Sequence, residues 1–152
     1  MKKSLSIFIL SFLMLRLSAI NYYVSPTGND VNAGTNESPK FNISALVNSV
    51  NPGDTIFVLP GTYNYNAITR LTRSGTADIR ICIFGTGYTT SAERPVLNYA
   101  LQGAGDANRA FYLEAGANYW HIKGIKIQEA GDNGIKIESN WNIIEFCDFD
   151  AC

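Results

Sequence analysis

Two stretches decide the fold: NYWHIKGIKI at residues 118–127 and NWNIIEFCDF at residues 140–149, which align without a gap at an offset of 22 residues. Apolar positions remain apolar between the two copies. The apolar matches are Ile122 with Ile144, Ile125 with Cys147 and Ile127 with Phe149. A repeat of 20 to 25 residues in strand-like sequence is typical of a solenoid.

The charged positions of the repeat change sign, since Lys123 aligns with Glu145 and Lys126 with Asp148. Neighbouring parallel strands lie about 4.8 Å apart, so each outward residue sits beside its partner one turn later. Opposite charges there contribute roughly 0.2 to 1 kcal/mol, and each buried apolar partner about 1.5 to 3 kcal/mol. The sequence therefore predicts a right-handed parallel β-helix in which residues some two dozen positions apart share one column.

The turns of the repeat also match. Asn118 aligns with Asn140, which predicts an asparagine ladder whose side-chain amides bond along the stack, and Tyr119 aligns with Trp141. Further upstream the match is looser, with Phe111 and Leu113 opposite 135 and 137 at an offset of 24. We expect strands over 55–59, 79–84, 110–113, 121–127, 134–137 and 143–149.

One segment has helical periodicity. The apolar residues Ile43, Leu46, Val47 and Val50 recur at helical spacing, and Pro52-Gly53 follows. Because solenoids need their ends covered, this segment predicts a short N-terminal capping helix. No counterpart follows the last strand, so we expect a β-helix truncated at its C-terminal end.

The N-terminal residues predict export. Lys2 and Lys3 precede an apolar stretch from Leu5 to Leu15, which ends near the small residues Ser18 and Ala19. This layout is typical of a signal peptide over 1–19, and it leaves a mature chain of 20–152. The apolar stretch is shorter than the roughly 20 residues that span a bilayer, so we expect a secreted, extracellular protein with no membrane anchor.

Charge and cysteine content narrow the functional classes. Without the basic residues of the signal, the net charge falls from −1 to about −4, which argues against nucleic acid as a partner. A polyanionic sugar would need a local basic groove or bridging cations. Cys82, Cys147 and Cys152 allow at most one disulfide, and the sequence does not decide which residues form it.

Several motifs together resemble the front of secreted pectate lyases of polysaccharide lyase family 9. In chain order the motifs are Tyr22-Tyr23-Val24-Ser25-Pro26-Thr27-Gly28-Asn29-Asp30, Pro52-Gly53-Asp54-Thr55-Ile56, Gly61-Thr62-Tyr63, Tyr119-Trp120-His121-Ile122-Lys123-Gly124 and Ala130-Gly131-Asp132-Asn133-Gly134-Ile135. The resemblance covers nearly the whole mature chain and consists of strand and turn positions.

The resemblance implies a β-helix that cleaves polygalacturonate, or another plant cell-wall polysaccharide, by β-elimination. It also implies a calcium ion held by aspartates, and a lysine that acts as general base. In the family these residues lie on later turns, so no catalytic residue is carried over to this chain. Calcium is thus expected for the full-length family, whereas this fragment is expected to be inactive and to need no cofactor.

Two carboxylates are candidate calcium ligands. Asp148 and Asp150 are two residues apart on an expected strand, and hence on one face of it. The alternative is that Asp148 pairs with Lys126 and that Asp150 belongs to a turn.

Two aromatic residues are candidate substrate-binding groups. Tyr119 and Trp141 fall at the repeat offset and would form a platform for a sugar ring if they point outward. The alternative is packing of a turn against the strands.

Three other polar residues are expected to face outward. Lys123 and Lys126 have carboxylate partners one turn later, and His121 lies at the surface. These environments do not favour a catalytic role.

Two other functions share these features. The chain could be a non-catalytic extracellular β-helix that binds glycans, or a lyase or epimerase for another uronate polymer. The fold alone does not separate them from a pectate lyase.

Overall fold

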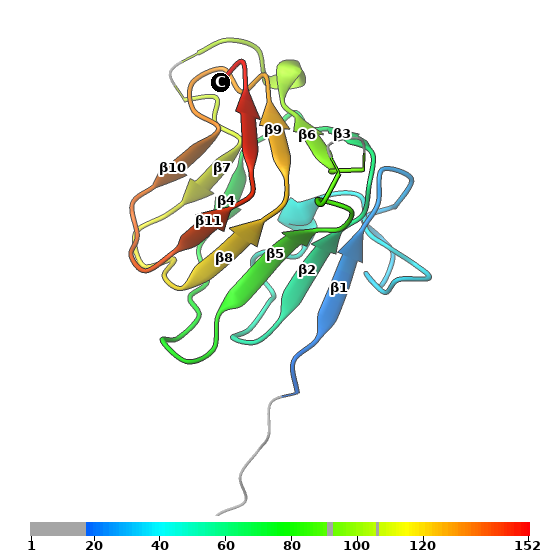
Figure 1. The fold of residues 1–152 in the computed structure, drawn as a ribbon, viewed down its shortest axis with the longest axis vertical. Coiled ribbons are helices and arrows are strands. Elements are labelled where there is room, and N and C mark those ends of the chain that lie inside the picture. The colour runs from blue at the N-terminus through cyan, green and yellow to red at the C-terminus, as the bar shows by residue number, and fades with distance from the viewer. Residues whose placement is uncertain (1–17, 91–92, 106) are drawn as a thin grey trace, which may run out of the picture.

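The computed structural model describes residues 18–90, 93–105 and 107–152 (Figure 1). In this part of the chain, all pairings between strands are parallel. The strands are β1 (Asn21–Val24), β2 (Thr55–Val58), β3 (Thr62–Asn64), β4 (Thr69–Leu71), β5 (Ile81–Gly85), β6 (Val96–Asn98), β7 (Phe111–Leu113), β8 (Trp120–Lys123), β9 (Lys126–Gln128), β10 (Ile135–Ile137), β11 (Ile143–Glu145) and β12 (Asp148–Asp150).

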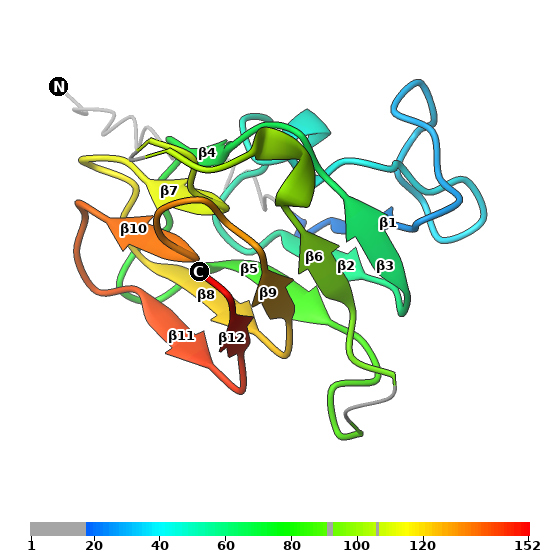
Figure 2. The same ribbon diagram turned by 90° about the horizontal axis from the view of Figure 1, so that it is seen from above.

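The strands form three sheets that enclose one core. Sheet A has the order β1-β2-β5-β8-β11, sheet B the order β3-β6-β9-β12 and sheet C the order β4-β7-β10. The chain visits A, then B, then C, and each further turn stacks on the one before it (Figures 1 and 2). This arrangement is a parallel β-helix, as the repeat predicts.

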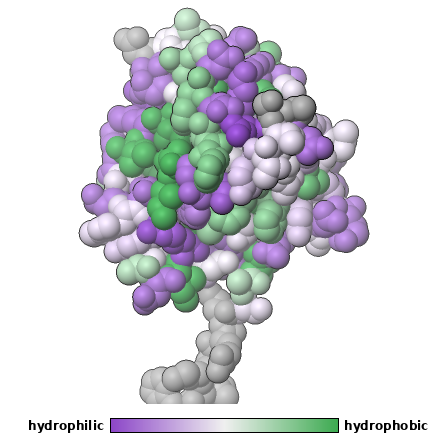
Figure 3. Space-filling model, in the orientation of Figure 1, coloured by the Kyte–Doolittle hydropathy of each residue, from purple (hydrophilic) through white to green (hydrophobic). Residues whose placement is uncertain are grey.

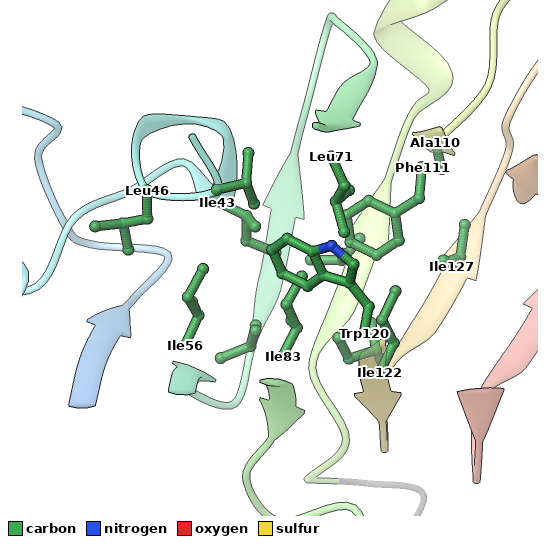
Figure 4. Close-up of a cluster of buried hydrophobic side chains, with 14 of the residues drawn as sticks. Ile43, Leu46, Ile56, Leu71, Ile83, Ala110, Phe111, Trp120, Ile122 and Ile127 are labelled. Atoms are coloured by element: carbon green, nitrogen blue, oxygen red, sulfur yellow. The ribbon is translucent and has the colours of Figure 1, made fainter. Parts of the chain in front are cut away.

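The predicted columns are confirmed by the strand register. Ile122 pairs with Ile144 in sheet A, and Ile127 pairs with Phe149 in sheet B. The column continues upstream, because Ile56 and Ile83 precede Ile122 in the same register. Figure 4 shows Ile56, Ile83 and Ile122 in one cluster with Trp120 and Phe111, and all five side chains are fully buried.

Two of the expected strands are wrong in extent. The stretches 121–127 and 143–149 are each divided into a strand of sheet A and a strand of sheet B. The chain bends at Gly124, which has φ 70°, and at Phe146, which has φ 51°. A left-handed residue turns the backbone through the corner that an unbroken strand would pass straight through.

The expected capping helix over 43–50 is also wrong. The structure has a 3-10 helix, η1 (Ile43–Ala45), and the side chain of the preceding Asn42 accepts a hydrogen bond from the N–H of Ser44. Hydrogen-bonded turns follow it. The apolar residues of the segment are nevertheless buried, and Ser44 Oγ bonds to Thr69 Oγ1 of β4 at 3.3 Å. The apolar periodicity of the segment is satisfied by burial against sheet C without a continuous α-helix.

The asparagine ladder differs in its bonding. Asn118 and Asn140 are neighbours, but Asn118 Oδ1 accepts from the backbone N–H of Asn140 at 2.8 Å. This bond joins a side chain to the backbone, whereas the prediction joined two side-chain amides.

Inward positions on the last turn are exposed. Ile137 and Phe149 are 45% and 48% exposed, whereas their partners Leu113 and Ile127 on the preceding turn are fully buried. Figure 3 shows hydrophobic side chains gathered over β10, β11 and β12.

The expected signal peptide lies, apart from Ser18 and Ala19, outside the described residues. In the described part, no helix has the length and apolar character of a membrane span.

A second 3-10 helix, η2 (Ala100–Gln102), follows sheet B after β6. The three cysteines are all free thiols.

Candidate functional site

An aromatic column runs across the outer face of sheet A. In parallel strands alternate residues face outward, and the register aligns Tyr23, Phe57, Phe84 and Lys123 on four successive strands. The rings of Tyr23 and Phe57 stack at 5.3 Å, and those of Phe57 and Phe84 meet edge to face at 6.5 Å. The column presents a continuous aromatic surface that ends at one ammonium group.

A hollow of about 310 Å³ opens at this end of the column. It lies between the outer face of sheet A and the turn that follows β5, at the start of a loop that projects from the body of the molecule (Figure 2). Its lining residues are Phe57, Phe84, Gly85, Thr86, Gly87, Tyr88, Thr89 and Lys123.

The close approach of Tyr88 to Gly124 positions one wall of the hollow. A Cβ atom on Gly124 would lie 2.5 Å from Cβ of Tyr88, closer than two non-bonded carbon atoms can come. Gly124 also has φ 70°, a conformation that glycine adopts without strain. The glycine at this corner thus serves both the bend from sheet A to sheet B and the seating of Tyr88.

Lys123 is held at the rim by two rings and a carboxylate. Its Nζ lies 5.0 Å from the ring centre of Tyr88 and 5.3 Å from that of Phe146. The same Nζ is 3.2 Å from Oε1 of Glu145. The interaction with Tyr88 and then that with Glu145 raise the pKa of Lys123. Lys123 is therefore a fixed positive charge at neutral pH.

Glu145 joins Lys123 to His121. His121 Nε2 lies 2.9 Å from Oε1 of Glu145, the same oxygen that Lys123 contacts. Hydrogen bonds from His121 and from Lys123 lower the pKa of Glu145. His121 also packs edge to face on Phe84, with ring centres 4.9 Å apart. The polar cluster of Lys123, Glu145 and His121 therefore packs against the aromatic column through the His121 ring.

This arrangement suits a flat ligand that carries a negative charge. The described lining residues contain aromatic rings, the hydroxyl groups of Thr86, Tyr88 and Thr89, and one ammonium, but no carboxylate. Concave sites with an apolar floor and few polar groups are typical of small-molecule binding. Chemically, the hollow can bind a ring by its face and an anion by its edge.

The candidate calcium ligands are engaged elsewhere. Asp148 pairs with Lys126 in the strand register, but its carboxylate binds Arg94. Asp150 forms an ion pair with Lys126, whose Nζ lies 2.9 Å from Oδ2 of the aspartate. In the residues that the structure describes, no group of three or more His, Cys, Asp or Glu side chains is close enough to hold a metal ion. The expected pairing of Lys126 with Asp148 is thus wrong at the level of the side chains.

The candidate sugar platform forms a stack. The rings of Tyr119 and Trp141 lie 4.9 Å apart and nearly parallel, at 9°. Both residues have left-handed backbones, with φ 59° and 57°, and Trp141 is 62% exposed. The guanidinium of Arg80 lies 5.7 Å from the ring centre of Tyr119. The two rings therefore contact each other across adjacent turns, and sugar binding there stays a prediction.

The aromatic residues of the hollow are not among the site residues predicted from the sequence. Phe57 and Phe84 lie at alternating positions of two strands that were expected, which is the signal that would have placed them on the outer face. Tyr88 lies in a turn that brings it over Gly124 only in three dimensions. The structure brings Tyr88 together with Lys123, and it leaves Asp148 and Asp150 on sheet B.

Comparison with known proteins gives a match over most of the chain. Residues 22–152 match the family model described as "Pel9A-like, right handed beta helix region". A curated relative, "Pectate lyase L" of Paenibacillus polymyxa (strain SC2), is 35% identical over 129 residues. That match covers 85% of this chain and 28% of the relative, so the chain spans less than a third of the relative's length.

Solved structures give the same architecture. The crystal structure of pectate lyase Pel9A superposes with a TM-score of 0.66 and 27% identity, and the match covers 82% of this chain and 32% of that one. A rhamnogalacturonan lyase superposes with a TM-score of 0.63 at 20% identity, over 84% of this chain and 38% of that one. The second likeness is one of fold alone. The expected right-handed β-helix is confirmed.

Proposed function

Because this chain belongs, as its motifs predict, to the Pel9A-like family of right-handed β-helix proteins, we propose that it acts on a pectin-type polysaccharide. The activity would be the calcium-dependent β-elimination of polygalacturonate, proposed for the whole protein. The observation that carries the proposal is the family match over 22–152 together with the named pectate lyases among the relatives.

The residues described here do not fit a calcium site. Asp148 and Asp150 are bound by Arg94 and Lys126, and no third carboxylate joins them among the described residues. An oxygen-only calcium site takes about six to eight ligands, more than these two side chains can supply. We therefore propose that the chain alone does not cleave the polymer.

The hollow on sheet A supports polymer binding by this part of the protein. Its aromatic floor and single ammonium suit a sugar that bears a carboxylate, which is the repeating unit of polygalacturonate.

The predicted signal over 1–19 supports export to the compartment where plant cell-wall polymers occur. Sequencing the N-terminus of the exported protein would test this, with Ile20 expected as the first residue.

A chimera tests the catalytic proposal. The segment of the Paenibacillus polymyxa pectate lyase L that matches this chain would be replaced by residues 22–152. Ultraviolet absorbance of unsaturated products would then be followed on polygalacturonate, with and without calcium. We expect product from the chimera only with calcium, and none from this chain alone. A chimera with native-like circular dichroism that forms no product would contradict the proposal.

A second candidate function is non-catalytic glycan binding. The hollow and the lack of a metal-binding cluster in the described residues favour it. The same experiment separates the two, because a folded chimera that retains polymer binding but yields no product would support this function.

A further inference from the structure

We propose that the hollow beside Tyr88 is a binding subsite for a single hexuronate ring, with the sugar carboxylate on the ammonium of Lys123. The inference rests on the proposed function and adds to it the place of contact and the group that selects a charged sugar.

The size of the hollow sets the size of the ligand. Its volume of about 310 Å³ is at the lower end of the roughly 300 to 1,000 Å³ that small-molecule sites span. A single pyranose ring and its substituents match this volume. The hollow lies at the end of the aromatic column, so a longer polymer could continue over Phe57 and Tyr23 along the outer face of sheet A.

The apolar surface fits the face of a sugar ring. Phe57, Phe84 and Tyr88 supply aromatic carbon to the lining of the hollow. The C–H groups on one face of a hexuronate pack on such surfaces. The hydroxyl groups of Thr86 and Thr89 lie in the same lining and are of the type that bonds to sugar hydroxyls.

The charge of the hollow selects an acidic sugar over a neutral one. Lys123 is the only charged residue among the described lining residues. An ammonium has three N–H donors, and within the described ranges Glu145 is the one carboxylate at ion-pair distance from that of Lys123. His121 shares the Glu145 oxygen, so Glu145 keeps a partner when Lys123 turns toward a ligand. Methyl esterification of the sugar would remove the charge that Lys123 recognises.

The structure offers a matched control. Lys136 lies on sheet C, with its Nζ 5.0 Å from the ring centre of Tyr112 and with Glu138 as its ion-pair partner. Lys123 has the same two kinds of neighbour, a tyrosine ring and a glutamate. Lys136 does not line the hollow, so Lys136→Met changes the same chemistry at a place where no ligand is proposed.

Calorimetric titration of the purified chain with trigalacturonate tests the subsite. We expect Lys123→Met to weaken binding at least about tenfold, because it removes the charged donor to the sugar carboxylate. We expect Phe84→Leu to weaken binding by a similar factor, because it removes an aromatic surface for the sugar ring. We expect Lys136→Met to bind like the unchanged chain, and the fully methyl-esterified trisaccharide to bind the unchanged chain as weakly as trigalacturonate binds Lys123→Met. Circular dichroism and urea unfolding confirm that each variant is folded.

The outcomes separate the subsite from the proposed function. If the unchanged chain binds trigalacturonate while Lys123→Met and Phe84→Leu bind it equally well, the subsite is wrong and the proposed function stands. If a folded chain binds no uronate oligomer at all but the chimera with pectate lyase L is active, the subsite is again overturned alone. If the chimera is inactive as well, the proposed function falls with it.

Discussion

Lys123 and Glu145 lie one turn apart in the β-helix, with Nζ of one 3.2 Å from Oε1 of the other, although 22 residues separate them in sequence. The repeat that builds the core thus also builds the rim of the hollow. Because the turns stack in register, outward residues of different turns form one surface, and the aromatic column of sheet A continues into this charged pair.

The inward column makes a direct prediction about stability. Ile122 is fully buried between Ile83 and Ile144, so Ile122→Ala should lower the free energy of unfolding by about 2 to 5 kcal/mol. Ile143, which precedes Ile144 on β11 and is in register with His121, is 36% exposed, and Ile143→Ala should cost about 1 kcal/mol or less. Urea unfolding measures both changes, and equal losses would count against the stacked register.

The ion pairs of Glu145 predict a dependence on acid pH. Bonds from His121 and Lys123 lower the pKa of Glu145 from its usual 4.5. A carboxylate with a lowered pKa adds stability above its unfolded pKa, and this is lost as the pH falls through the folded value. A carboxyl carbon titration by NMR should therefore give Glu145 a midpoint below 4.5. The midpoint should rise in His121→Gln, and a midpoint at or above 4.5 in the unchanged chain would refute the pairing.

Buried tyrosines predict a loss of stability at alkaline pH. Burial raises the pKa of Tyr63, Tyr65 and Tyr99 above the usual 10.0. Because the phenols stay protonated in the folded chain, stability is complete below the unfolded pKa and falls as the pH rises beyond about 10. Near-ultraviolet absorbance should show these three tyrosines ionising only together with unfolding. Ionisation of all tyrosines near pH 10 while the chain remains folded would contradict their burial.

Left-handed corners make a prediction about backbone strain. Glu129 is exposed and has φ 57°, which costs a residue other than glycine or asparagine about 1 kcal/mol. Glu129→Asn should raise the free energy of unfolding by about 0.5 to 1 kcal/mol, because asparagine tolerates this conformation. Glu129→Gln removes the same charge without relieving the strain and should bring no gain. Thermal unfolding compares the two variants.

The sequence predicts the fold where the signal is periodic. The match of Ile122 with Ile144 is a direct result of stacking, and it predicts the register correctly. The bend at Gly124 could not be read from the pattern, because apolar residues continue on both sides of it. Residues 43–50 have a helical pattern, yet burial against β4 requires only that their apolar side chains face inward.

The candidate site was harder to predict than the fold. Asp148 and Asp150 are close in sequence, but they form ion pairs with Arg94 and Lys126, which lie on other turns. The hollow depends on where the turn after β5 places Tyr88, and this follows from contact with Gly124 rather than from any local motif. Contacts between residues distant in sequence decide both results.

Affinity electrophoresis of the purified chain in gels that contain polygalacturonate tests the central claim most directly. We expect the chain to migrate more slowly than in a plain gel, and we expect fully methyl-esterified polymer to cause little retardation. Equal mobility of the folded chain in all three gels would contradict the claim that this chain itself binds a pectin-type polymer.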